Sequence, residues 1–517
     1  MALKLNSEET LFRNELIFAV DAKAVNMDNV LLNLFMLLNH NGIRPKQRAI
    51  SIDKGELTLE KLKNNFVALE KNNDVIGFTE HPEAAELWLR SNLVNMVNRG
   101  NPDKEKISSL RPIHLESYRL RNAPNSRDYN TADQLYAMLG VNTKTKEELK
   151  SFLAEGWDKT SNRITNIKGL DVDSLGILTL IKDINQGVFS SVETISLVSA
   201  LLKKQAELFC EDINCLLAYK RSIPRNVLLD YLKTLVSFHL SLYLQKLIYL
   251  LPKMIPAGTT EVPDDWSVVL DVTGKLDSKV SSLAIADTER MLNSLYDYIR
   301  ATFKINSALK KLGKPRTNSN DINLALQILK NNPLDFEPYF QARWDIMIEQ
   351  IDADDREWIE DFAVFESTYF AKYIELVNNQ KGNYQYRYHF QLIDNLAQKN
   401  SERGFIAQGR SKKHPRRFVL GTRLLETLVQ ILLLRSDGSQ FTTQPISIED
   451  LTTSLRSRYG LIINGVDEPR FETADLNINL AFKENVEAFK NNLRQIGFYN
   501  VLSDAYIMQK IRPRYEL

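Results

Sequence analysis

The feature that most constrains this chain is a long apolar stretch over residues 227–251, which a fold must either bury or place in a membrane. A membrane helix needs about 20 almost uninterrupted apolar residues. The stretch is interrupted by Asp230, Lys233, His239, Gln245 and Lys246. We therefore expect a buried core helix over residues 225–251, in a protein that does not cross a membrane.

The rest of the chain also favours helices. Gly and Pro number only 20 and 16 in 517 residues, which leaves little room for long flexible linkers. Apolar residues recur at helical spacing over residues 192–217, and three prolines within residues 252–263 indicate a linker. The sequence thus predicts a mainly α, multi-domain protein with minor β structure.

Turn-rich segments predict a division into four domains. Residues 1–125 would form an N-terminal α/β or helical domain, and residues 126–260 a helical domain. Residues 261–400 would form a middle domain that changes from α/β to helical. Residues 401–517 would combine a basic arm with a C-terminal winged-helix-like module.

Charge is balanced over the whole chain but not along it. The 66 Lys and Arg against 65 Asp and Glu give a net charge of +1, which excludes a polycation. Residues 401–423 nevertheless hold seven Lys or Arg and one Glu. We expect this basic arm to contact either nucleic acid or an acidic partner protein.

The cysteine and histidine residues indicate no special chemistry. Cys210 and Cys215 lie in an apolar helical pattern, and two cysteines in a chain of this size exclude a disulfide scaffold. We expect inert core thiols in a reducing compartment. No spacing for a metal site and no signal-peptide core appear, so we expect a cytoplasmic protein without a metal or cofactor.

The order of elements after residue 421 is typical of a winged helix-turn-helix. Helices are expected over residues 422–434, 447–459 and 480–496, with a short strand at 441–446 and a terminal hairpin around 502–505. Ser447 and Asp450 are spaced nearly as a capping box, and Gly460 suits a helix end. In such modules the second helix of the turn lies in the major groove of DNA. Winged helices also dock proteins.

Basic side chains on this module and on the arm are the expected phosphate contacts. On the third helix they lie beside a core stripe that begins at Phe482 and Val486 and ends at Ile496. The alternative is an ordinary solvated face. The full set is Lys412, Lys413, Arg416, Arg417, Lys483, Lys490, Arg494, Lys510, Arg512 and Arg514.

Three other patterns leave alternatives open. Asp271 ends an expected strand, and is either the carboxylate of an α/β site or an ordinary strand end. Six acids within residues 352–361 form either a solvated helix start or a docking face for a basic partner. The aromatic residues 384–389 can stack on bases or edge a core. No motif of a known catalytic site is present, and we assign no catalytic residue.

The C-terminus also carries phrases that resemble a known family. These are LLETLVQILLL at 424–434, LRSRYGLIIN at 455–464 and LRQIGFYNVLSDAYIMQKIRPRY at 493–515. They resemble accessory proteins of multi-gene bacterial anti-phage defence systems, first the methylation-associated type and second the phosphorothioate-dependent restriction type. The resemblance implies partner subunits such as an ATPase, a methyltransferase or a nuclease, and it implies no catalytic residue.

Three functions follow as hypotheses. The first is a non-catalytic DNA-binding and assembly subunit of an anti-phage defence or restriction complex. The second is a divergent metal-dependent nuclease or nucleotide-using enzyme, with Asp271 as its best carboxylate. The third is a protein-binding scaffold that makes no nucleic-acid contact.

Overall fold

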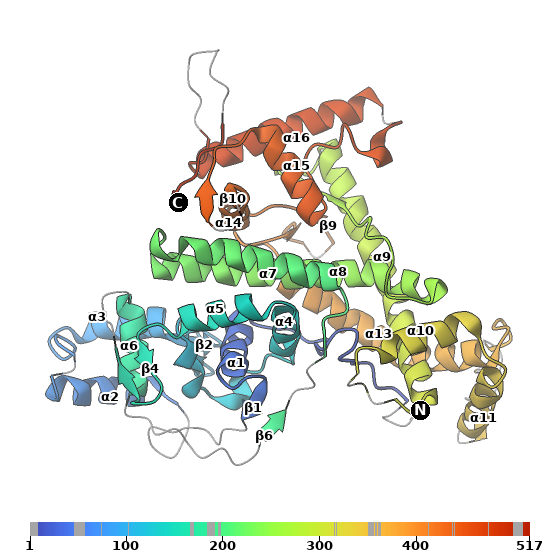
Figure 1. Ribbon diagram of the computed structural model, residues 1–517, viewed down its shortest axis with the longest axis horizontal. Helices are drawn as coiled ribbons and strands as arrows, with labels where there is room; N and C mark the ends of the chain where they lie inside the picture. The colour runs from blue at the N-terminus through green and yellow to red at the C-terminus, as the bar shows by residue number, and fades with distance from the viewer. Residues whose placement is uncertain are drawn as a thin grey trace. The chain divides into compact units, whose positions relative to one another are not determined.

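The computed structural model describes most of the chain, and its helices and strands are labelled in Figure 1. The described residues are 9–45, 57–73, 75–101, 103–165, 170–182, 192–194, 198–314, 316, 318–349, 356, 359, 363–411, 413–436, 438, 440–473, 475–499 and 510–517. They are mainly helical with short strands, which confirms the predicted mainly α class.

The chain forms two compact units. The N-terminal unit comprises Val25–Leu197 and Ala206–Val236, and the C-terminal unit comprises Met1–Ala24, Val198–Gln205 and Ser237–Glu516. The finer division into four domains stays a prediction. The acids of residues 352–361 lie outside the described residues.

The N-terminal unit consists of short helices with two-stranded antiparallel ladders between them. Its helices are α1 (Met27–Asn39), α2 (Leu59–Lys71), α3 (Pro82–Trp88), α4 (Thr131–Leu139), α5 (Thr143–Leu153), α6 (Val172–Ile181) and the short turns η1 (Leu89–Leu93), η2 (Leu115–Arg119), η3 (Ala123–Asn125) and η5 (Tyr219–Arg221). Its strands pair as β1 (Ile43–Pro45) with β6 (Val192–Thr194), β2 (Val94–Val97) with β3 (Lys106–Leu110), and β4 (Trp157–Asp158) with β5 (Arg163–Ile164). Phe66 is fully buried in its core.

The predicted core helix is α8 (Arg225–Ala257), and it begins at the expected residue. It continues past Pro252, because Leu251 and Met254 are buried and keep this turn packed. Gly258, in the left-handed region at φ 71°, follows its last residue. The predicted linker over residues 252–263 is therefore wrong in its first part, which is helical.

The predicted helix over residues 192–217 is wrong at its start. Residues 192–194 form β6, paired antiparallel with β1 so that Thr194 lies opposite Ile43. Helix α7 begins only at Lys203 and ends at Ala218 (Lys203–Ala218). Within α7, Cys210 is a buried free thiol, and burial raises its pKa to about 11.

Helix α9 (Lys279–Lys311) is the element around which the C-terminal unit packs (Figure 1). Its neighbours are α10 (Asp321–Asn331), α13 (Tyr369–Leu396), α16 (Leu476–Gln495), β7 (Val268–Val269) and β9 (Arg416–Phe418). The other elements are α11 (Phe336–Glu349), β8 (Ile406–Gln408), α14 (Thr422–Leu432), β10 (Leu434–Ser436), β11 (Phe441–Thr443), α15 (Ile448–Tyr459), β12 (Leu461–Ile462) and η6 (Pro469–Phe471). Ser278 caps the first turn of α9.

Two short parallel strands join distant parts of this unit. In β7 and β12, Val268 lies opposite Leu461. Val269 and Ile462 are buried with Phe482 of α16 in one apolar cluster. The last hundred residues thus share a core with the segment that leads into α9.

Candidate functional site

Helix α15 begins and ends where local chemistry predicts. The Ser447 hydroxyl accepts from the Asp450 N–H at 3.0 Å, and the Asp450 side chain accepts in return from the Ser447 N–H, which completes the predicted capping box. These hydrogen bonds lower the pKa of Asp450. Gly460 ends the helix in the left-handed region at φ 77°. The helix is therefore fixed at both ends.

The chain before α15 pairs with the chain after α16. Ile446 and Ile511 form an antiparallel bridge, and the Arg512 N–H donates to the Phe498 carbonyl at 3.0 Å. Three segments centred on Ile446, Ile511 and Phe498 therefore lie side by side. The tip of the predicted hairpin, residues 502–505, lies outside the described residues.

Helix α16 has one buried and one exposed face, nearly as predicted. Phe482, Phe489 and Leu493 are buried. Asn485, rather than the expected Val486, completes the buried face. Its amide donates to the carbonyls of Leu270 and Ile463 at 2.9 Å each and thus joins the chain after β7 to the chain after β12.

Five of the ten predicted phosphate contacts are exposed and make no ion pair with the described residues. Lys483 and Arg494 lie on α16, where 11 residues of separation return a side chain to nearly the same side of a helix. Lys510 and Arg512 follow in the chain after α16, and Lys413 lies in the β8–β9 loop. Lys412 lies outside the described residues.

Arg416 is held inside the C-terminal unit. Its Nε and Nη2 donate to the two carboxylate oxygens of Asp394 at 2.8 and 2.7 Å. Its guanidinium also covers the ring of Phe390, 3.9 Å from the ring centroid. The bidentate pair fixes β9 to the end of α13, so this side chain has a structural partner.

Arg417 and Asp271, which the sequence assigned to two rival functions, pair with each other. Arg417 Nε donates to Asp271 Oδ2 at 2.8 Å, and the Asp271 side chain has no exposed surface. The other Asp271 oxygen accepts from the Thr273 hydroxyl at 2.6 Å and from the Thr273 N–H. Both carboxylate oxygens are therefore committed to hydrogen bonds inside the fold.

Two further predicted contacts have acidic neighbours. Arg514 forms an ion pair with the mostly buried Glu426 of α14 and donates to the Ile496 carbonyl. Lys490 pairs with Glu487 one turn earlier in α16, at 2.6 Å. Arg514 thus anchors the end of the chain, while Lys490 is largely neutralised by Glu487.

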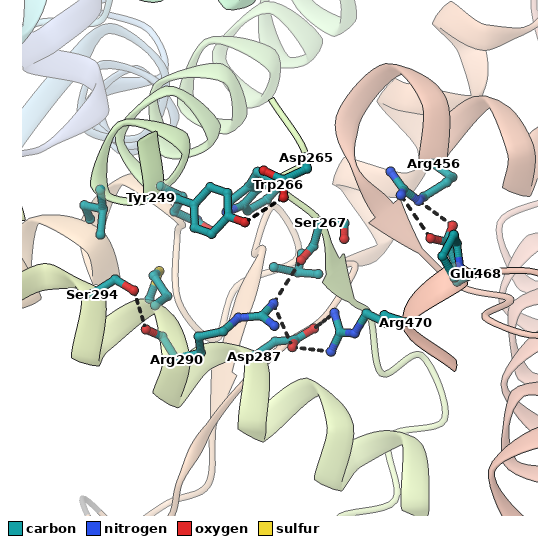
Figure 2. A pocket seen from close by; sticks show the side chains of 15 residues that line it. Tyr249, Asp265, Trp266, Ser267, Asp287, Arg290, Ser294, Arg456, Glu468 and Arg470 are labelled. Atoms are coloured by element: carbon teal, nitrogen blue, oxygen red, sulfur yellow. Dashed lines mark hydrogen bonds and ion pairs between the residues drawn. The ribbon is translucent and has the colours of Figure 1, made fainter. Parts of the chain in front are cut away.

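A polar pocket lies between α8, α9 and α15 (Figure 2). The sequence did not predict it. Its volume is about 350 Å³. Its walls carry three arginines, three carboxylates and two aromatic side chains. The residues are Gln245, Ile248, Tyr249, Asp265, Trp266, Ser267, Val268, Asp287, Arg290, Met291, Ser294, Arg456, Glu468, Pro469 and Arg470.

Asp287 is the buried centre of this pocket. Its carboxylate accepts from both Nη atoms of Arg470, at 2.5 and 3.0 Å, and lies 3.1 Å from an Nη atom of Arg290 (Figure 2). It also accepts from the Val269 N–H at 2.7 Å. One buried carboxylate thus orders two arginines and the end of β7.

The other two carboxylates of the pocket are also paired. Glu468 accepts a bidentate pair of hydrogen bonds from Arg456. Burial opposes ionisation of Asp265, but hydrogen bonds from Lys253 and Tyr249 lower its pKa overall. A ligand in the pocket would therefore meet guanidinium N–H donors and aromatic surface. It would find no unpaired carboxylate there.

The local sequence gives little sign of this pocket. Asp287 and Arg470 are 183 residues apart, and only the i, i+3 spacing of Asp287 and Arg290 is a local signal. Among the described residues, no group of three or more His, Cys, Asp or Glu side chains could hold a metal ion.

One helix in the described part of the chain, α8, is long and apolar enough to span a membrane. However, 94% of its most apolar window is buried inside the protein. Its burial matches the core helix of a soluble protein, as the interrupting charges predicted.

Comparison with known proteins gives one match. The family model described as "Methylation-associated defense system protein MAD7" matches residues 7–515. The match therefore extends far beyond the C-terminal phrases that suggested the resemblance. No curated protein and no solved structure matches the chain.

Proposed function

The chain belongs to the family of Methylation-associated defense system protein MAD7, and we propose that it is a DNA-binding and assembly subunit of such an anti-phage defence system. In this proposal it binds the phosphate backbone through its C-terminal module and catalyses no reaction. It would work in the cytoplasm beside other subunits, such as an ATPase, a methyltransferase or a nuclease.

The observation that carries the proposal is the set of exposed cations on and after α16. Lys483, Arg494, Lys510 and Arg512 are exposed and make no ion pair with the described residues, whereas Arg514 nearby is tied to Glu426. Exposed cations that form no ion pair within the fold can meet the phosphates of a nucleic-acid backbone. We name these four residues the basic face.

The strand pairing around Ile446 supports a winged-helix reading of the module. Helix α14, β11, α15 and α16 follow in that order, and the segments at Phe498 and Ile511 return beside Ile446. In a winged helix-turn-helix the helix equivalent to α16 enters the major groove. Lys483 and Arg494 would then meet phosphates on either side of that groove.

The burial of Asp271 favours this proposal over an enzyme built on that residue. A catalytic carboxylate must reach its substrate, whereas Asp271 is fully covered and bonded to Arg417 and Thr273. Assembly with partners has separate support, because the adjacent Val364 and Phe365 are 76% and 88% exposed. A scaffold without DNA contact remains the outcome to test against.

The test is duplex DNA binding by the full chain with the basic face neutralised. The variant carries Lys483→Ala, Arg494→Ala, Lys510→Ala and Arg512→Ala. A matched control removes two lysines and two arginines that are exposed in the N-terminal unit: Lys71, Arg99, Lys104 and Arg163.

We expect the basic-face variant to lose most of its affinity for duplexes of unrelated sequence, and the control to keep it. Fluorescence anisotropy with two labelled duplexes measures this loss. Equal affinity for both variants would remove the basic face from DNA binding. If the unmodified chain did not bind duplex DNA, the result would favour the alternative function, a protein-binding scaffold.

A further inference from the structure

The polar pocket holds an arginine whose donors are mostly unused by the fold. Arg290 of α9 uses only its Nη2 atom, which lies 3.1 Å from Asp287 and donates to the Ser267 carbonyl at 3.3 Å (Figure 2). Its Nε and Nη1 atoms donate to none of the described residues. Because this side chain is 53% exposed, a ligand in the pocket can reach those two atoms.

The other two arginines of the pocket also keep spare donors. Arg470 of η6 uses both Nη atoms on Asp287, and Arg456 of α15 uses Nε and Nη2 on Glu468. Each Nη atom carries two hydrogens, so each guanidinium retains N–H groups beyond those that bind its carboxylate. Three separate elements thus direct donors to one pocket.

Positive charge is in slight excess around the pocket. Asp287 faces two arginines, whereas Glu468 faces Arg456 alone. The third carboxylate, Asp265, is paired with Lys253 at 3.0 Å. The three carboxylates therefore meet three arginines and one lysine, which leaves a surplus of one positive charge. This surplus favours an anionic ligand over a neutral or cationic one.

The opposite side of the pocket is aromatic. Figure 2 shows Tyr249 and Trp266 across the pocket from Arg290 and Arg470, and Met291 adds apolar surface to the lining. A volume of about 350 Å³ lies at the low end of small-molecule sites. An inorganic anion at the arginines would leave most of this space empty. The pocket therefore fits a small ligand that carries both an anionic group and a ring.

We propose that the polar pocket binds a nucleoside monophosphate. A phosphate monoester carries a charge of about −1.5 to −2 at pH 7 and three acceptor oxygens, and the planar guanidinium matches its geometry. A carboxylate has only two oxygens and could use fewer of the donors of Arg290 and Arg470. The base would lie toward Tyr249 and Trp266, because aromatic side chains favour contact with a flat ring. This site is separate from the basic face and goes beyond the proposed binding of duplex DNA.

The test is isothermal titration calorimetry of the full chain with deoxyadenosine monophosphate. Deoxyadenosine and inorganic phosphate serve as the two halves of this probe. We expect the nucleotide to bind at least about tenfold more tightly than either half, because only the whole molecule contacts both sides of the pocket.

Two variants separate charge from space. Arg290→Ala removes the most exposed arginine while Arg470 still pairs with Asp287, and Ser294→Phe fills part of the pocket without removing a charge. Each should weaken nucleotide binding at least about tenfold, the first through lost charge-assisted hydrogen bonds and the second through lost space. The control Arg387→Ala removes an exposed arginine of α13 outside the pocket and should bind within about threefold of the unmodified chain.

The absence of nucleotide binding by the unmodified chain would overturn the proposal, as would equal affinity for Arg290→Ala. Phosphate that bound as tightly as the nucleotide would overturn the assignment of the base to the aromatic side. Thermal unfolding gives a second readout and checks that each variant folds. Nucleotide should raise the Tm of the unmodified chain and of Arg387→Ala more than that of the two pocket variants. The basic-face variant should keep its nucleotide affinity, so this proposal and duplex binding can fail independently.

Discussion

At the scale of single residues, buried and partly buried aspartates decide what the arginines of the C-terminal unit can do. Asp271 holds Arg417, Asp394 holds Arg416, and Asp287 holds two arginines. The sequence predicted both Arg416 and Arg417 as phosphate contacts from local charge density. It could not reveal the pairing of Arg417, because its partner lies 146 residues away in the chain.

The substitution Asp287→Asn tests the buried centre of the polar pocket. Asparagine still accepts from the Val269 N–H but removes the charge that Arg470 and Arg290 share. Because both arginines are partly exposed, we expect a loss of about 1 to 3 kcal/mol in the free energy of unfolding. Urea unfolding measures it, with the exposed Asp265→Asn as control. An Asp287→Asn loss no larger than that of the control would contradict this role.

His389 makes the C-terminal unit sensitive to acid. The ring is buried against Phe12 and Tyr298, and burial lowers its pKa to about 4, whereas an unfolded histidine titrates near pH 6.5. Between these values the unfolded chain binds the extra proton. The buried neutral ring of His389 therefore leaves the stability of the fold unaffected above pH 6.5. As the pH falls from 6.5 toward 4, protonation of the unfolded chain lowers the free energy of unfolding.

The variant His389→Phe isolates this effect, because phenylalanine fills a similar volume and does not titrate. We expect the free energy of unfolding of the unmodified chain to fall more steeply between pH 6.5 and 4.5 than that of the variant. The difference would approach about 1.4 kcal/mol per pH unit. Parallel pH profiles in urea unfolding would show that His389 binds its proton equally well in the folded and unfolded chains and would refute the assignment.

At the scale of elements, helix ends were predictable and strand partners were not. Ser447, Asp450 and Gly460 act on neighbouring residues, so their capping roles follow from spacing alone. The pairing of β6 with β1 depends on residues about 150 positions away in the chain. The apolar spacing over residues 192–217 predicted a helix there and gave no sign of this strand. The i, i+4 pattern likewise predicted most of the buried face of α16, but not Asn485, which is buried through its hydrogen bonds to the chain after β7 and β12.

Substitutions at two glycines in the left-handed region distinguish the cost of backbone strain from the cost of a steric clash. Gly460 and Gly438 have φ of 77° and 96°, but a Cβ at Gly460 would lie 2.6 Å from the Trp266 carbonyl oxygen, while a Cβ at Gly438 meets nothing within 4 Å. We expect Gly438→Ala to cost about 1 kcal/mol. Gly460→Ala should cost about 2 to 4 kcal/mol because the clash adds to the strain. Similar shifts in the urea midpoint for the two variants would contradict the clash. They would mean that the backbone at Trp266 moves away from the new Cβ without loss of stability.

At the scale of the whole molecule, the sequence predicted both the mainly α class and the resemblance to a defence-system family. The proposed function depends on exposed side chains. Charge counting predicted the exposed cations on and after α16. The stacking of Tyr296 on Tyr386, which lies 90 positions further along the chain, gives no local signal.

The central claim is that the basic face binds phosphates, and the salt dependence of duplex binding tests it most directly. Each phosphate contact contributes about 0.9 to the slope of log affinity against log salt. We predict that neutralising Lys483, Arg494, Lys510 and Arg512 lowers the magnitude of that slope by about 3 to 4 for any duplex sequence. The control lacking four cations of the N-terminal unit should keep the slope of the unmodified chain. A slope unchanged by the basic-face substitutions would contradict the account.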